Sequence, residues 1–332
     1  HQGGVVIAIG ARPANSEAEF ASPRVQAIAS ELFGVGDAPC TVTNPAGGAG
    51  ILLPTGMIAL VPQIVDSLFE RDAACAEAKA PVKITRRRID GHEVYFAIND
   101  SDAAWEGAIG FCGRGVNEQW DPATGLMTPL ADGTQVPVRL GPYGAMLFRS
   151  ATASVPKRLG GTVPAALSIT CEPLPKTPKP AVGQGKSVQS ELTGDDTSGW
   201  RAAATLTKGQ VDTFLFLNFA YPVPLNLTGC EGLAIDASVP PGQRTGTELL
   251  VFLNTADGGR FLGSTGRYLN TPGSGRAYAM FSQFKPFGQT RGELDLSQVA
   301  SISVGWGGYL GTEGEHITLT VKPPQRFVCS AK

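Results

Sequence analysis

Short apolar runs of strand length, separated by turn residues, dominate this chain from about residue 82 to its end. Within many of the runs, apolar and polar residues alternate, which is the pattern of β-strands that bury one face. Asp90-Gly91 and Asp132-Gly133 lie between such runs and favour tight turns. The 332 residues also include 42 glycines and 25 prolines, well above the usual share of ~12%. This pattern predicts a mainly β protein.

The first 81 residues follow a different pattern, which predicts an incomplete, flavodoxin-like α/β segment. Val5–Ile9 is apolar throughout, as is typical of a strand buried on both faces. Ser22 and Pro23 mark the start of a helix and Gly34 its end. A second strand and a second helix are expected at Gly50–Leu53 and Ile58–Leu68. Because Val5–Ile9 needs a neighbouring strand on each side, we expect this segment to be the tail of a larger α/β domain.

The remaining chain divides into two sandwiches joined by a proline-rich connection. Residues 82–150 predict a compact antiparallel β-sandwich. Residues 151–190, which include the run Pro173–Pro180, predict a semi-rigid linker. Residues 191–332 return to strand-sized runs between glycine-rich loops, the pattern of a jelly roll. The expected fold class is therefore mainly β, with two antiparallel β-sandwiches, the second a jelly roll, preceded by the incomplete α/β segment.

Charge and composition exclude several classes of partner. The 27 Lys and Arg residues balance 29 Asp and Glu residues, and a net charge of −2 gives nucleic acid or an anionic membrane no electrostatic attraction. The apolar runs are all far shorter than the ~18 residues that span a bilayer. His1, His92 and His316 are too scattered for most zinc sites or for a catalytic triad. We therefore predict no nucleic-acid partner, no membrane partner and no resident metal centre of this kind.

Three motifs that resemble reactive sites have simpler explanations. Gly47–Gly50 precedes an apolar run and not a helix, so no phosphate-binding cofactor site is predicted. Glu118 and Asp121 are the best local carboxylate pair for glycoside hydrolysis. However, the Asp-Pro-Ala-Thr-Gly sequence that begins at Asp121 is typical of a turn. Asp195 and Asp196 offer a site for a structural calcium ion, although such a pair is usually a solvated turn.

The number of cysteines, six, indicates the kind of compartment in which the protein is found. Their even number fits disulfide formation in an oxidising environment, and none forms a C-x-x-C pair. Cys112 and Cys230 are equally well explained as small buried apolar residues. Their pairing stays open, and we expect a secreted or periplasmic protein.

Aromatic residues near the end of the chain point to sugar binding. Trp306 and Tyr309 lie on a glycine-flanked stretch, and Arg267 and Tyr268 lie in another loop. Aromatic rings stack on the flat C–H faces of sugars, while nearby polar groups hold the hydroxyls. The two glycines between Trp306 and Tyr309 would permit a bulge that turns both rings to one side. The alternative is that Trp306 belongs to the core of its strand.

An ordered set of motifs in the first 150 residues is similar to part of a known enzyme family. The motifs are Gly3–Gly10, Pro23–Gln26, Glu31–Gly34, Val94–Asn99, Glu118–Gly125 and Leu140–Gly144. They resemble the region that follows the catalytic barrel in large bacterial α-L-rhamnosidases. The segment 191–329 resembles jelly-roll carbohydrate-binding modules, through Leu225–Gly229 and Leu294–Gln298.

The resemblance implies the C-terminal accessory portion of a glycoside hydrolase that acts on plant or microbial polysaccharide. Its partners would be a polysaccharide and an upstream catalytic domain of the same polypeptide, whose barrel it would support. The catalytic carboxylates of that family lie on the barrel, so no catalytic residue is carried over to this chain. A linked binding module would raise the local substrate concentration. The alternative is a non-catalytic lectin or adhesion protein that uses the same sandwiches.

Overall fold

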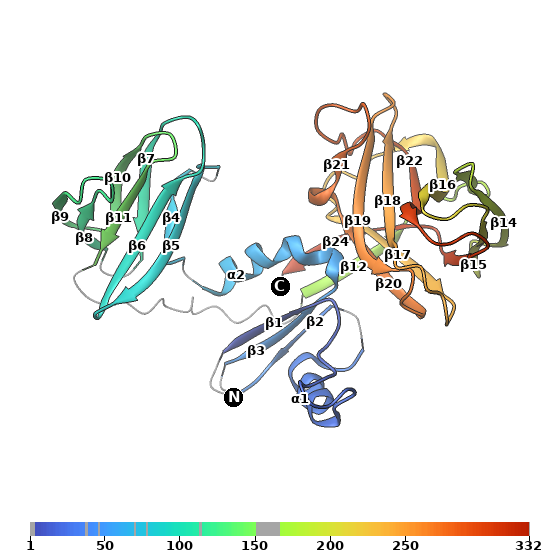
Figure 1. The fold of residues 1–332 in the computed structure, drawn as a ribbon, viewed down its shortest axis with the longest axis horizontal. Coiled ribbons are helices and arrows are strands. Elements are labelled where there is room, and N and C mark those ends of the chain that lie inside the picture. The colour runs from blue at the N-terminus through green and yellow to red at the C-terminus, as the bar shows by residue number, and fades with distance from the viewer. Residues whose placement is uncertain are drawn as a thin grey trace. The chain divides into compact units, whose positions relative to one another are not determined.

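The computed structural model describes residues 4–36, 39–45, 47–69, 71–77, 79–112, 115–150 and 167–331 (Figure 1). The described part is mainly β, as predicted, and the chain divides into two compact units. Unit 1 comprises residues 1–61 and 162–332, and unit 2 comprises residues 62–161. Unit 1 therefore joins two segments that are far apart in the sequence. Residues 151–166, which form part of the predicted linker, lie outside the described residues.

The N-terminal segment of unit 1 is a three-stranded sheet with one helix packed on it. The central strand is β3 (Ala49–Leu53), which pairs in parallel with β1 (Val5–Ile9) and antiparallel with β2 (Cys40–Thr43). Helix α1 (Pro23–Phe33) ends before Gly34, as expected, and packs Ala29 and Phe33 against Leu52. The two strands and the first helix predicted here are present.

β1 lies at an edge of this sheet, and part of its apolar surface is exposed. Every residue of β3 is buried, whereas Val6 and Ile9 of β1 are 46% and 42% exposed. Among the described residues β1 pairs with β3 alone, and β2 takes the other side of β3. β2 was not predicted, because its sequence, Cys-Thr-Val-Thr, is short and half polar and so lacks the apolar run that indicates a strand.

The second predicted helix is divided into a 3-10 helix, η1 (Thr55–Leu60), and an α-helix, α2 (Val61–Leu68). Gly56 of η1 approaches the sandwich of unit 1 so closely that a Cβ atom there would lie 1.8 Å from the Tyr278 carbonyl oxygen. Its neighbour Met57 is fully buried. This contact packs the N-terminal segment against the sandwich and accounts for their forming one unit.

The rest of unit 1 is a sandwich of two antiparallel sheets. The six-stranded sheet has the order β13 (Ala181–Gln184), β16 (Val211–Leu225), β22 (Val299–Leu310), β18 (Glu248–Thr255), β19 (Arg260–Tyr268) and β21 (Lys285–Pro286). The seven-stranded sheet has the order β12 (Leu167–Pro173), β24 (Gln325–Ala331), β17 (Gly232–Val239), β23 (His316–Val321), β15 (Gly199–Leu206) and β14 (Val188–Asp195), with β20 (Gly273–Met280) paired to β17. Apolar residues from both sheets form one core between them.

The predicted linker is partly wrong, because its second half belongs to this sandwich. β12 pairs along β24, and β13 pairs with β16. Both strands lie at the outer side of their sheets, which is where sheets tolerate proline, and Pro173 is the last residue of β12. Proline content alone therefore did not distinguish an edge strand from a linker.

Unit 2 contains a small sandwich of two sheets. Its five-stranded sheet has the order β5 (Val82–Ile89), β6 (His92–Asn99), β11 (Ala145–Arg149), β8 (Val116–Trp120) and β9 (Met127–Gly133). Its three-stranded sheet has the order β10 (Gln135–Leu140), β7 (Trp105–Phe111) and β4 (Ala73–Cys75). Tyr95, Ile109 and Phe148 lie in the core between the sheets. Because β4 pairs with β7, the sandwich begins before the expected boundary at residue 82.

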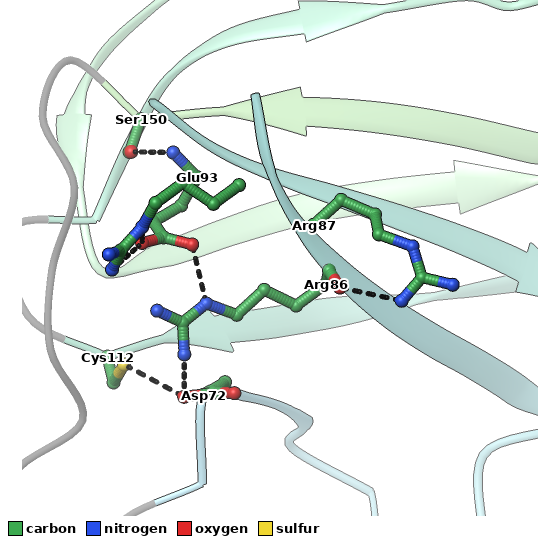
Figure 2. Close-up of polar contacts among 7 residues, drawn as sticks. Asp72, Arg86, Arg87, Glu93, Cys112 and Ser150 are labelled. Carbon is green, nitrogen blue, oxygen red and sulfur yellow. Dashed lines mark hydrogen bonds and ion pairs between the residues drawn. The ribbon is translucent and has the colours of Figure 1, made fainter. Parts of the chain in front are cut away.

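A buried carboxylate ties the strands of unit 2 together (Figure 2). Glu93 on β6 has a side chain only 1% exposed, and Arg86 Nε and Arg88 Nη2 donate to its two oxygens at 2.6 and 2.7 Å. Arg86 also reaches Asp72, with 2.7 Å between Nη1 and Oδ1. The Ser150 hydroxyl accepts a hydrogen bond from the Glu93 backbone N–H at 3.1 Å. The Arg86 hydrogen bond is the main reason that the pKa of Glu93 falls to about 2.

This cluster predicts how the stability of unit 2 depends on pH. The folded-state pKa of Glu93 is about 2, and an unfolded glutamate titrates near ~4.3. Ionised Glu93 therefore stabilises the fold above pH ~4.3, and this contribution is lost as the pH falls towards 2. Glu93→Gln is expected to lower the free energy of unfolding by ~3 kcal/mol at pH 7, because it leaves two arginines beside a neutral buried group.

The measurement is thermal unfolding followed from pH 7 to pH 3. The wild-type melting temperature should fall more steeply over this range than that of Glu93→Gln. Glu106→Gln, which changes an exposed glutamate of β7, is the matched control and should behave like the wild type. Equal slopes for Glu93→Gln and the wild type would show that Glu93 is not the titrating group.

Candidate functional site

The outer face of the six-stranded sheet in unit 1 carries a groove with a volume of about 940 Å³. Residues of β13, β16, β22, β18 and β19 line it, together with Phe287, which follows β21. The groove thus crosses most of the sheet.

Strict alternation along the central strands builds both the core and the groove. On β16, Leu215 and Leu217 point inwards and are fully buried, whereas Phe214, Phe216 and Asn218 line the groove. On β22 the same period places the apolar side chains of Ile302, Val304 and Trp306 in the core, and Ser301 and Ser303 in the groove. The register Leu215–Trp306 aligns the inward residues of the two strands. The groove residues of β16 and β22 therefore stand on strands that pair continuously from Val211 to Ala220.

Four phenylalanine rings form a continuous row along the groove. The ring centroids of Phe214 and Phe216 are 6.2 Å apart, those of Phe216 and Phe252 are 5.0 Å apart, and those of Phe252 and Phe287 are 4.9 Å apart. Gly305 lies opposite Phe216 in the sheet, and a Cβ atom at this glycine would lie 1.9 Å from the Leu215 carbonyl oxygen. The glycine therefore allows the close approach of β22 to the backbone of β16.

A row of amides and hydroxyls runs next to the rings. The Asn254 amide nitrogen donates to Ser301 Oγ at 2.9 Å and lies 3.3 Å from Ser303 Oγ. Ser303 Oγ donates in turn to Asn218 Oδ1 at 3.1 Å. Within the described part of the chain, the Asn218 amide nitrogen and the Asn254 amide oxygen have no protein partner. Both are thus held in place with a donor and an acceptor left for a ligand.

The two ends of the groove differ in chemistry. Tyr309, which is 77% exposed, stands at one end opposite Asp212 on β16. At the other end the Arg260 guanidinium carbon lies 4.6 Å from the ring centroid of Phe252 and 5.5 Å from that of Phe287. These are cation–π distances, so the guanidinium is oriented by the rings on which it lies.

Of the four predicted site residues, the structure brings only Tyr309 to the groove. The prediction for Trp306 is wrong: its side chain is 1% exposed and packs in the core, because no bulge interrupts the alternation between residues 306 and 309. Arg267 donates from Nη2 to the Gly273 carbonyl oxygen at 2.7 Å, and Tyr268 lies opposite Glu248. Neither of these two lines the groove.

The four phenylalanines and the amide row were missed from the sequence. Period two is visible in the stretch Phe214-Leu-Phe-Leu-Asn218, but both of its faces are apolar. Such a strand is typical of a fully buried position, so the pattern did not show which face is outside. Phe252 and Phe287 join the row from other strands, which only the sheet order reveals.

The carboxylate pairs singled out from the sequence are engaged in structural contacts. Glu118 accepts a hydrogen bond from Arg149 at 3.0 Å, and this contact is the first cause of its lowered pKa. Asp121 accepts from the Ala123 backbone N–H at 2.8 Å, as expected for the predicted turn, which lowers its pKa. Lowered pKa values keep both groups ionised, so neither suits a general acid.

Both carboxylates of the predicted calcium pair also accept hydrogen bonds from the protein. Asp195 accepts from the Ser198 backbone N–H at 2.7 Å, and Asp196 accepts from the Trp200 indole at 2.8 Å. No group of three or more His, Cys, Asp or Glu side chains in the described residues is arranged to hold a metal ion. Over the same residues, no helix is long and apolar enough to cross a membrane.

No protein-family model matches the sequence, and no curated protein matches it. Among solved structures, the family 11 carbohydrate-binding module of a cellulosomal cellulase of Clostridium thermocellum is similar over 50% of this chain and 97% of its own, with 12% identity and a TM-score of 0.35. The rhamnosidase from Novosphingobium sp. PP1Y is similar over 91% of this chain, with 15% identity and a TM-score of 0.31. This chain covers 26% of that rhamnosidase. Identities and TM-scores this low assign neither ligand nor activity.

The burial of Trp306 predicts a purely structural role. Trp306→Ala should lower the stability of unit 1 by ~3–5 kcal/mol, because it leaves a cavity between the two sheets. Thermal unfolding of the variant measures this loss. Tyr309→Ala, which removes an exposed ring from the same strand, is the control and should leave the melting temperature nearly unchanged. A Trp306→Ala protein as stable as the wild type would contradict the core position.

Proposed function

We propose that unit 1 binds a carbohydrate chain in the groove on its six-stranded sheet. The observation that carries this proposal is the row of phenylalanine rings beside the row of asparagine and serine side chains. A sugar ring has an apolar C–H face and a rim of hydroxyls. The phenylalanines suit the face and the amides suit the rim.

The length of the groove favours an oligosaccharide or polysaccharide over a single sugar. Tyr309 and Ser301 line it on the same strand, and at ~3.3 Å per residue they are ~26 Å apart along β22. A second cavity, of about 510 Å³, shares Tyr309 and the two glycines before it and extends the groove past this end. A chain of several sugars is needed to fill such a surface.

A finer proposal is that the chain is an accessory portion of an α-L-rhamnosidase-like glycoside hydrolase. It rests on the ordered motifs of the first 150 residues, and the predicted secreted or periplasmic location belongs to it. The alternative is a lectin or adhesion protein that uses the same groove. The coding sequence upstream distinguishes them: an adjoining barrel with two suitably placed carboxylates supports the enzyme, and any other neighbour supports the lectin.

Removing one ring of the row should weaken binding without unfolding the protein. Phe216 lies between Phe214 and Phe252, so Phe216→Ala is expected to reduce affinity about tenfold, equivalent to ~1.4 kcal/mol. Affinity electrophoresis of the full chain in gels containing β-glucans, galactans and rhamnose-containing polysaccharides measures the effect.

The matched control is Phe20→Ala, which removes an 81% exposed ring of unit 1 that does not line the groove. It should bind like the wild type. Unchanged binding by a folded Phe216→Ala protein, or no retardation by any polysaccharide, would contradict the proposal.

The full chain is further expected to lack hydrolytic activity towards aryl rhamnosides and other aryl glycosides. Its best local carboxylate pair caps a turn and binds Arg149, so it is not free to protonate a leaving group. Release of nitrophenol from the corresponding aryl glycosides is the measurement. Turnover that Glu118→Gln abolishes would show that the β8–β9 hairpin is catalytic after all.

A further inference from the structure

Two arginines without carboxylate partners stand at one end of the groove. Arg260 lines both the groove and an adjoining cavity of about 410 Å³, and Arg291 lines that cavity as well. In the described residues neither guanidinium forms an ion pair with a carboxylate. The other charged residue of the adjoining cavity is Asp257, so this end carries an excess of positive charge.

Arg260 is held in position by its backbone and by its neighbours. Its N–H donates to Thr290 Oγ1 at 2.9 Å, and its carbonyl oxygen accepts from the Phe287 N–H at 2.9 Å. Its guanidinium lies over the rings of Phe252 and Phe287. Stacking uses the flat face of a guanidinium and leaves the N–H groups at its edge free to donate.

The hydrogen bonds of the other charged groups at this end leave both arginines without a carboxylate partner, so that they can bind a ligand. Asp257 accepts from the Thr255 hydroxyl at 2.5 Å and from the Gly259 N–H at 3.1 Å, contacts that lower its pKa. Arg291 donates from Nη1 to the Thr290 carbonyl oxygen at 3.0 Å, a contact that leaves its charge uncompensated. Asp212, the only other charged residue that lines the groove among the described residues, lies at the Tyr309 end.

We propose that this end of the groove binds an oxyanion substituent of the glycan, a carboxylate of a uronic acid unit or a sulfate ester, through Arg260 and Arg291. The proposal rests on the proposed function and adds to it the class of polysaccharide, which is acidic. The fixed fork of Arg260 matches a two-oxygen acceptor, and the phenyl rings beneath it exclude water from one side of the contact. The sugar that carries the charge would then occupy the Arg260 end, with the neutral part of the chain along the phenylalanine row.

The test compares polymers that share a backbone and differ in charge. The full chain is titrated calorimetrically with polygalacturonate and with its methyl ester, and with a sulfated galactan and its unsulfated counterpart. At low salt we expect the charged member of at least one pair to bind about tenfold more tightly than the neutral one. Added salt should reduce this preference, because it screens the charges.

Variants at Arg260 test whether its charge, and not the shape of the groove, causes the preference for a charged polymer. Arg260→Gln should reduce the ratio of charged to neutral affinity about tenfold, and Arg291→Gln should reduce it less. Arg260→Lys should retain part of the ratio, because it keeps the charge and loses the planar fork. Arg201→Gln removes an exposed charge from β15 in the other sheet and controls for net charge.

The outcomes distinguish this inference from the proposed function. A preference for polygalacturonate or for the sulfated galactan that Arg260→Gln removes supports the inference and identifies the source of the oxyanion. Equal affinity for charged and neutral polymers, or an equal loss for both in Arg260→Gln, overturns the inference and leaves the carbohydrate groove intact. Binding to no polymer at all overturns the proposed function.

Discussion

The alternation of side chains along β16, β22 and β18 is the constraint on which unit 1 depends. Successive residues of a strand point to opposite faces, so the backbone that buries Leu215, Leu217 and Trp306 must also present Phe214, Phe216 and Asn218 on the other side. The core and the groove therefore cannot be changed independently. A one-residue slip in the β16–β22 register would exchange the two faces and destroy both.

This arrangement explains how large aromatic side chains are ordered on the outer face of the sheet, where Phe252 is buried and Phe214 and Phe287 are exposed. A phenylalanine side chain gains free energy when its apolar surface is removed from water. Here each ring of the row contacts another ring, which covers part of that surface outside the core. The amides beside them are oriented by hydrogen bonds to serines of a neighbouring strand. A ligand would thus meet groups that are already ordered, which reduces the entropy lost on binding.

Glu93 in unit 2 and Arg260 in unit 1 meet opposite requirements. Glu93 is buried, and such a carboxylate is tolerated only because Arg86 and Arg88 satisfy it. Arg260 stays accessible at the end of a groove, where it lies over aromatic rings and forms no ion pair with a carboxylate of the described residues. The first charge stabilises the fold, and the second remains available for a ligand.

The sequence by itself determined the mainly β class, the helix from Pro23 to Phe33 and the turn at Asp121, because these depend on local pattern and on residues with restricted backbones. The aromatic signal near the end of the chain selected Trp306, which is buried. Only the tertiary structure decided which face of an apolar strand lies outside, since Phe214-Leu-Phe-Leu is apolar on both. It also decided that Phe252, Phe287 and Arg260 meet, because pairing between distant strands brings them together and no local pattern records that pairing.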